Sequence, residues 1–177
     1  RPSGKTAAQA RKQRWFAISG SVIAVLAIAY GVTYFQGHNF LPESTPGWLS
    51  RPGPQITATG DFGKAPKVSI PKDLVPSGKL EVDAPIKGDG RKIANGDTVV
   101  LKFAFHQWAK STDEEKPNES TSKELNSTWK QPAGQQTGQF VVGKTQLTGL
   151  DKGLVGQTAG SRLIIEIPPG DGFGKGQ

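Results

Sequence analysis

The sequence predicts an α+β domain that a proline-rich linker joins to a single N-terminal transmembrane helix. A long uncharged apolar run lies near the start of the chain, and a stretch rich in proline follows it. The remainder combines several short β-type patterns with one short helical pattern, which is typical of a mixed fold with antiparallel strands. The predicted parts are residues 1–14 as a basic cytoplasmic tail, 15–35 as a transmembrane helix, 36–78 as a proline-rich extended linker and 79–177 as the folded domain.

The apolar run extends from Trp15 to Phe35 and contains neither a charged residue nor a proline. A helix of this length reaches about 31 Å, which is roughly the thickness of the hydrocarbon core of a bilayer. Aromatic residues open and close the run, as interfacial anchors do. The run is longer than the apolar core of a cleaved signal peptide, and no A-x-A cleavage pattern follows it. These features predict an uncleaved membrane anchor.

The charge of the chain is concentrated in its first residues. The net charge is +7, whereas the chain after residue 14 carries 17 basic and 15 acidic residues. The positive-inside rule therefore places the tail in the cytoplasm and the domain outside the cytoplasmic membrane. The nearly balanced remainder does not support nucleic-acid binding. The basic residues of the tail are Arg1, Lys5, Arg11, Lys12 and Arg14.

Small residues recur along the predicted helix at spacings of three and four, which places them on one face. Such a stripe allows a second transmembrane helix to approach closely. We therefore expect two membrane partners, the lipid and a transmembrane helix of a larger complex. The alternative is that alanine and glycine are simply common in membrane helices. The residues of the stripe are Ala17, Gly20, Ala24, Ala27 and Gly31.

Residues 36–78 predict an extended, semi-stiff linker, because they contain seven prolines and little apolar periodicity. After residue 78 the pattern changes. One strand is predicted over Thr98–Phe105, where Val99, Leu101, Phe103 and Phe105 share a face. Further strands are predicted at Lys79–Val82, Gln139–Val142 and Arg162–Ile167, and the polar residues 109–124 predict a surface loop or flap.

The helical pattern of the domain lies between Leu147 and Val155. Leu147, Leu150 and Leu154 follow the spacing of one helical face, and Gly156 ends the pattern. The chain contains no cysteine, which excludes thiol catalysis and cysteine–zinc sites. Its two histidines are too few for a histidine-built metal site, so no cofactor is predicted.

Several segments of residues 79–177 occur in a recognisable order. They are K-G-D-G at 87–90, G-D-T-V-V at 96–100, L-N-S-T-W at 125–129, F-V-V-G-K at 140–144, G-L-D-K-G-L-V-G-Q at 149–157 and G-S-R-L-I-I-E-I-P-P-G-D-G-F-G at 160–174. This succession resembles FKBP-type peptidyl-prolyl cis–trans isomerases, and most closely the membrane or exported versions from actinobacteria. The resemblance implies an antiparallel half-barrel sheet wrapped on the short helix, with an apolar pocket between them. It also implies proline-containing protein clients.

The resemblance carries six pocket positions onto this chain: Phe103, Asn126, Phe140, Leu147, Leu150 and Phe173. Several depart from the family pattern. Phe103 and Phe173 stand where the family has tyrosine, Asn126 replaces an aspartate, and Leu150 replaces an aromatic residue. Gly138 replaces the aromatic partner of Phe140. Apolar character is kept while polar groups are lost, so two readings stay open. One is a membrane-anchored isomerase or chaperone of reduced activity. The other is a non-catalytic accessory or assembly subunit of a larger membrane complex, for example a respiratory complex.

The end of the recognisable region gives one more expectation. The resemblance implies a flap and a final apolar strand after G-F-G, whereas the sequence as given ends at Gln177. We therefore expect a sheet with one strand fewer than the family.

Overall fold

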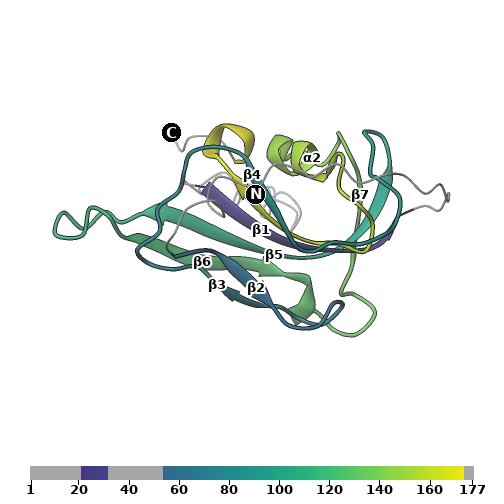
Figure 1. Cartoon of the computed structure of the whole chain (residues 1–177), viewed down its shortest axis with the longest axis horizontal. Coiled ribbons are helices and arrows are strands. Elements are labelled where there is room, and N and C mark those ends of the chain that lie inside the picture. The colour runs from purple at the N-terminus through teal and green to yellow at the C-terminus, as the bar shows by residue number, and fades with distance from the viewer. Residues whose placement is uncertain (1–20, 32–53, 174–177) are drawn as a thin grey trace, which may run out of the picture.

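The computed structural model describes residues 21–31 and 54–173. A six-stranded antiparallel sheet forms its centre, with a short helix over one face and a two-stranded hairpin over the other (Figure 1). Among the described residues the fold is therefore α+β, mostly antiparallel sheet with one α-helix, as the sequence predicted.

The main sheet has the strand order β4–β8–β1–β5–β6, and β7 pairs with the first part of β5. β5 is the longest strand and pairs with β7 over its first residues and with β6 over its last ones. The strands are β1 (Ser21–Gly31), β4 (Glu81–Ile86), β5 (Thr98–Lys110), β6 (Ser120–Ser127), β7 (Gly138–Val141) and β8 (Arg162–Ile167); the short 3₁₀ segments are η1 (Thr128–Lys130) and η2 (Pro169–Asp171).

β1 corrects the predicted transmembrane helix over Trp15–Phe35, because Ser21–Gly31 form a strand. This strand pairs antiparallel with β5 on one side and with β8 on the other. The side chains of residues 21–28 are all buried. A strand covered on both faces has an unbroken apolar sequence, which resembles that of a membrane helix. The rest of the predicted span lies outside the described residues, and no helix within them is long and apolar enough to cross a membrane.

The predicted stripe of small residues does not exist in this conformation. Successive side chains of a strand point to opposite faces, so Ala24 and Ala27 lie on different sides of the sheet. Ala24 belongs to the core beneath the helix, whereas Ala27 pairs with Lys102 and Arg162. Gly31 pairs with Val99 at the end of β1. Ala17 and Gly20 lie outside the described residues.

A short hairpin differs from the predicted linker. β2 (Thr57–Thr59) and β3 (Lys67–Ser69) pair antiparallel and cover one face of the main sheet. Ile56 and Ala58 are buried there against Ile23, Val25, Trp108 and Ile164. Strands of three residues are too short for a periodic signal, and the surrounding prolines hide them further. Residues 36–53 of the predicted linker lie outside the described residues.

The other face of the sheet is covered by α2 (Thr148–Leu154), close to the predicted Leu147–Val155. Leu150 and Leu154 are buried in a core with residues of β1, β5 and β8. Two glycines allow this close packing. A Cβ atom at Gly149 would lie 2.5 Å from Ile167, and one at Gly153 would lie 2.8 Å from Ile165. The backbone of the helix therefore approaches β8 directly.

The polar segment 109–124 is partly strand rather than loop. β5 continues to Lys110 and pairs with β6 from Ser120 onward, so only residues 111–119 connect the two strands. The base of this hairpin is fixed by Trp108, whose Nε1 donates to Ser120 Oγ at 2.8 Å, and by Ser120 N, which donates to Lys72 O at 2.6 Å. Polar residues suit a hairpin that extends away from the core into solvent, as Figure 1 shows.

Two buried charged side chains of β8 hold the segment that covers the hairpin face. Arg162 Nη1 and Nη2 donate to Gly60 O at 2.6 Å and to Asp61 O at 2.7 Å. Glu166 accepts from Ser77 N at 2.8 Å and from Ser77 Oγ at 3.1 Å. Burial raises the pKa of Glu166 to about 7, and the nearby Glu81 raises it further, against the hydrogen bonds from Ser77 and Gly78.

The raised pKa of Glu166 predicts that it makes the protein less stable as pH rises. Between about pH 4.5 and 7 only the folded state holds the proton, so this contribution to the free energy of unfolding falls through that range, by about 3 kcal/mol in all. Glu166→Gln removes the ionisation and keeps an acceptor for Ser77. We expect the variant to match the parent near pH 4.5 and to be more stable at pH 8, in urea denaturation.

The exposed Glu115→Gln is the matched control and should leave the difference from the parent independent of pH. A Glu166→Gln variant that loses stability at pH 8 would contradict the assignment, because the ionised carboxylate would then be the stabilising form.

Candidate functional site

The candidate site lies where β5, β7 and the start of α2 meet, on the helix-covered face of the sheet (Figure 1). Five of the six predicted pocket residues belong to one apolar cluster there. Asn126 is the sixth, and it pairs with Phe105 across β5 and β6. Cross-strand partners share a face, so Asn126 lies on the same side as this cluster. Within it, Phe103, Leu147 and Leu150 are buried, while Phe140 and Phe173 are partly exposed.

Three phenylalanines form the aromatic part of the site. The ring of Phe103 stacks on Phe105 with centroids 4.7 Å apart, and Phe140 meets Phe103 edge-on at 5.8 Å. These are the favoured geometries of aromatic pairs. The aromatic part is therefore a packed group with one partly exposed member.

Phe103 is held from behind by Thr128, which sequence reasoning did not single out. The backbone N–H of Phe103 donates to Thr128 Oγ1 at 2.9 Å, and this hydroxyl donates to Phe103 O at 3.3 Å. The last β5–β6 pair is Ala104 with Ser127, so the hydroxyl takes over where the ladder ends. The only signal in the sequence is the position of Thr128 directly after a predicted pocket residue and a serine.

Gly138 explains how Phe140 reaches Phe103. A Cβ atom at position 138 would lie 2.6 Å from Cε2 of Phe140 and 3.2 Å from Cε1 of Phe103. The ring of Phe140 thus occupies the space beside Gly138 that a side chain would need. The loss of an aromatic residue at this position is compensated by its neighbour two residues on.

The turn before α2 is fixed by hydrogen bonds to Asp151 and Thr145. Asp151 Oδ1 accepts from Gly143 N at 2.8 Å, and Thr145 Oγ1 accepts from Leu147 N at 3.2 Å. Gln146 has a φ of 67°, which is unusual for a residue other than glycine. This strained turn directs Leu147 into the cluster, where it lies against the start of the helix.

The chemistry available at the site is that of an apolar surface. None of its six residues is ionisable, and Asn126 supplies the amide group. Trp129, three residues further on, has an indole N–H that is buried without a partner among the described residues. Within the part of the chain that the structure describes, no group of three or more acidic or histidine side chains could hold a metal. The arrangement suits non-covalent binding of an apolar group.

Comparisons of the chain with protein-family models, with curated proteins and with solved structures find no match. The site is therefore interpreted from its own geometry and from the sequence motifs.

The packing of Phe140 over Gly138 gives a prediction. Gly138→Ala forces the ring away from Phe103, and we expect this to lower the free energy of unfolding by about 1–3 kcal/mol, as overpacking does. It should also expose the apolar surface of Phe103, which is measured as increased fluorescence of the apolar dye ANS.

Gly170→Ala is the control, because a Cβ atom at Gly170 meets nothing within 4 Å. Equal dye fluorescence for Gly138→Ala, Gly170→Ala and the parent would show that Phe140 does not cover the aromatic group.

Proposed function

We propose that the chain is an FKBP-type protein that binds proline-containing segments and catalyses their cis–trans isomerisation weakly. The observation that carries the proposal is the convergence of Phe103, Phe140, Leu147 and Phe173 on one cluster at the end of a fixed sheet. These residues lie far apart in the sequence and were selected from a motif order before their positions were known. Their adjacency supports a common site.

The proposed reaction needs no nucleophile. Rotation of an X–Pro bond faces a barrier of about 18–20 kcal/mol because it breaks amide resonance. A dry apolar surface favours the twisted amide, whose charges are less separated, and a few polar groups fix the peptide. Here Phe140 and Phe173 supply exposed apolar surface, and Asn126 supplies a neutral amide. Phe103 cannot donate a hydrogen bond from its side chain, which limits the proposed activity.

Restoring polar groups tests this proposal. The combined variant Phe103→Tyr, Asn126→Asp and Phe173→Tyr adds two hydroxyls and one carboxylate to the proposed site. Because one hydrogen bond contributes about 1 kcal/mol, we expect kcat/KM for an X–Pro peptide to rise about fivefold or more. NMR exchange spectroscopy on the peptide measures the rate.

Phe62→Tyr, on the opposite face of the sheet, is the control and should not change the rate. No gain from the combined variant in either turnover or peptide affinity would refute the proposed roles of these side chains.

A second candidate is a non-catalytic accessory or assembly subunit of a larger membrane complex. The packing of Phe140 over Gly138 favours it, because the ring fills space that a bound proline would need. The absence of phenol groups at positions 103 and 173 points the same way. In this candidate the partner is a transmembrane helix of the complex, and the domain contributes a binding surface alone.

For localisation, we propose attachment to the cytoplasmic membrane through residues 15–35, with the tail in the cytoplasm and the domain outside. The apolar composition of this segment and the basic tail support the proposal. Residues 21–31 cannot be this helix and β1 at the same time. Helix and strand are therefore alternative conformations, and each removes the same side chains from water and satisfies the backbone hydrogen bonds.

Ala24→Leu separates the two conformations. In β1, Ala24 is buried between its partners Phe105 and Ile165, so the larger side chain should lower the free energy of unfolding by about 1–3 kcal/mol. In a membrane helix leucine is favourable, so we expect the fraction that sediments with membranes after carbonate washing to stay unchanged.

Ala133→Leu, at an exposed loop position, is the control for stability. Unchanged stability of Ala24→Leu would place β1 outside the sheet, and loss of the membrane fraction would show that the segment is no anchor.

A further inference from the structure

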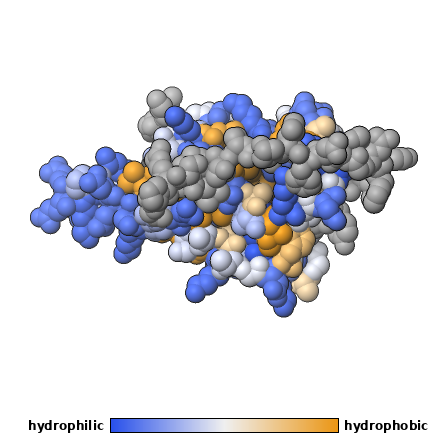
Figure 2. All heavy atoms as spheres, in the orientation of Figure 1, coloured by the Kyte–Doolittle hydropathy of each residue, from blue (hydrophilic) through white to orange (hydrophobic). Residues whose placement is uncertain are grey.

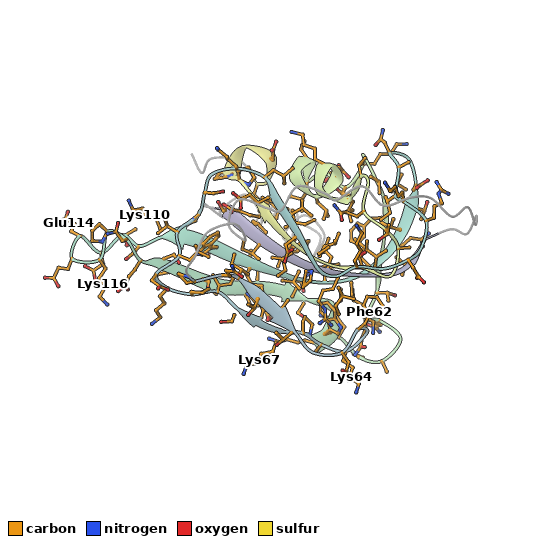
Figure 3. All side chains as sticks on the ribbon, in the orientation of Figure 1. Phe62, Lys64, Lys67, Lys110, Glu114 and Lys116 are labelled. Carbon is orange, nitrogen blue, oxygen red and sulfur yellow. The ribbon has the colours of Figure 1, made fainter. Side chains whose placement is uncertain are left out.

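The turn of the β2–β3 hairpin presents an aromatic side chain to solvent. Phe62, at this turn, is 41% exposed, although apolar residues of β2 and β3 pack nearby. Figure 3 shows Phe62 and Lys64 at the end of the hairpin layer, on the side of the sheet away from α2. In the space-filling view, hydrophobic surface appears in this region with hydrophilic surface beside it (Figure 2).

The turn is held from inside by two cationic side chains. Arg162 is fully buried and donates to the carbonyl oxygens of Gly60, Asp61 and, at 3.4 Å, Lys64. Lys102 Nζ donates to Gly63 O at 3.4 Å. These bonds fix the backbone on both sides of Phe62, so the exposed ring is presented by a defined turn.

The surroundings of Phe62 are basic. Lys64 and Lys67 are exposed, and Lys102 lies at the inner side of the turn. The acidic residue of the turn, Asp61, pairs with Lys64 at 3.2 Å. The opposite end of the molecule is acidic, because the loop 111–119 contains Asp113, Glu114, Glu115 and Glu119 against Lys116 alone. Figure 3 shows the two ends well separated.

We propose that this turn is a contact site for an anionic lipid surface. An exposed aromatic ring flanked by lysines is the combination that binds at the bilayer interface, where the ring enters the boundary region and the ammonium groups meet anionic headgroups. A protruding turn suits this surface better than a protein partner, since a stable protein interface needs about 800 Å² on each side. The acidic loop at the far end orients the molecule in the same sense.

This contact has a consequence for the candidate site. The hairpin and α2 cover opposite faces of the sheet (Figure 1). A molecule resting on lipid through Phe62 therefore turns the cluster around Phe103 toward the aqueous phase. The contact does not depend on the proposed isomerase activity or on the proposed helix at residues 15–35.

The absence of cysteine in the chain allows a position-specific test. The full chain with Ala65→Cys carries an environment-sensitive nitrobenzoxadiazole label at the turn, and Val155→Cys carries the label after α2, where Val155 is 46% exposed. We expect vesicles of phosphatidylglycerol and phosphatidylcholine to shift the emission of the label at 65 to shorter wavelength. Pure phosphatidylcholine vesicles should have little effect, and the label at 155 should not respond to either.

Variants in the Ala65→Cys background measure the contribution of each group. Phe62→Ser should weaken the response about tenfold in lipid concentration, and Lys64→Gln with Lys67→Gln should weaken it about twentyfold. Two controls should have no effect: Val75→Ser, at a site that is 38% exposed, and Lys110→Gln with Lys116→Gln at the far hairpin. These changes lie at exposed positions, so folding is retained.

Three outcomes would overturn the proposal. One is an equal response of the labels at 65 and 155, as insertion through the N-terminal segment alone would give. The second is an unchanged response after Phe62→Ser. The third is no response to anionic vesicles, which would leave an acidic protein as the partner of this surface.

Discussion

The pairing of β1 with both β5 and β8 is the interaction on which the rest of the described structure depends. Without it the sheet would divide, because β4 and β8 are joined to β5, β6 and β7 through this strand. β1 also feeds both cores. Val22, Ala24, Leu26 and Ile28 pack under α2, whereas Ile23 and Val25 pack under the hairpin. Removing this strand would thus cost backbone hydrogen bonds on two sides and apolar burial on two faces.

The sequence predicted those elements whose environment is one-sided. β5 alternates because one face of its first half meets the α2 core, and α2 shows helical spacing because one face meets β8. β1 was missed because full burial removes the alternation that separates a strand from a membrane helix. β2 and β3 were missed because each has three residues. Their position depends on Arg162, which lies about a hundred residues later in the chain.

The candidate site was predictable in its membership and not in its packing. Motif order identified Phe103, Phe140 and Leu147, and the topology brings them together because β7 and the start of α2 follow one another beside β5. The fit of Phe140 against Gly138, and the bond from Thr128 to Phe103, depend on side-chain rotamers and on where β6 ends. Such features carry no periodic signal along the chain.

The two faces of the sheet are built on different principles. The α2 face is an apolar core, whereas β8 places Arg162 and Glu166 beneath the hairpin segment, where each bonds to backbone groups. Buried charges add little net stability, since an apolar side chain in the same place is often as stabilising or more so. Their directional bonds instead define where a segment lies. Arg162 bonds to three carbonyl oxygens around Phe62, so its burial is better explained by the position of that turn than by the stability of the domain.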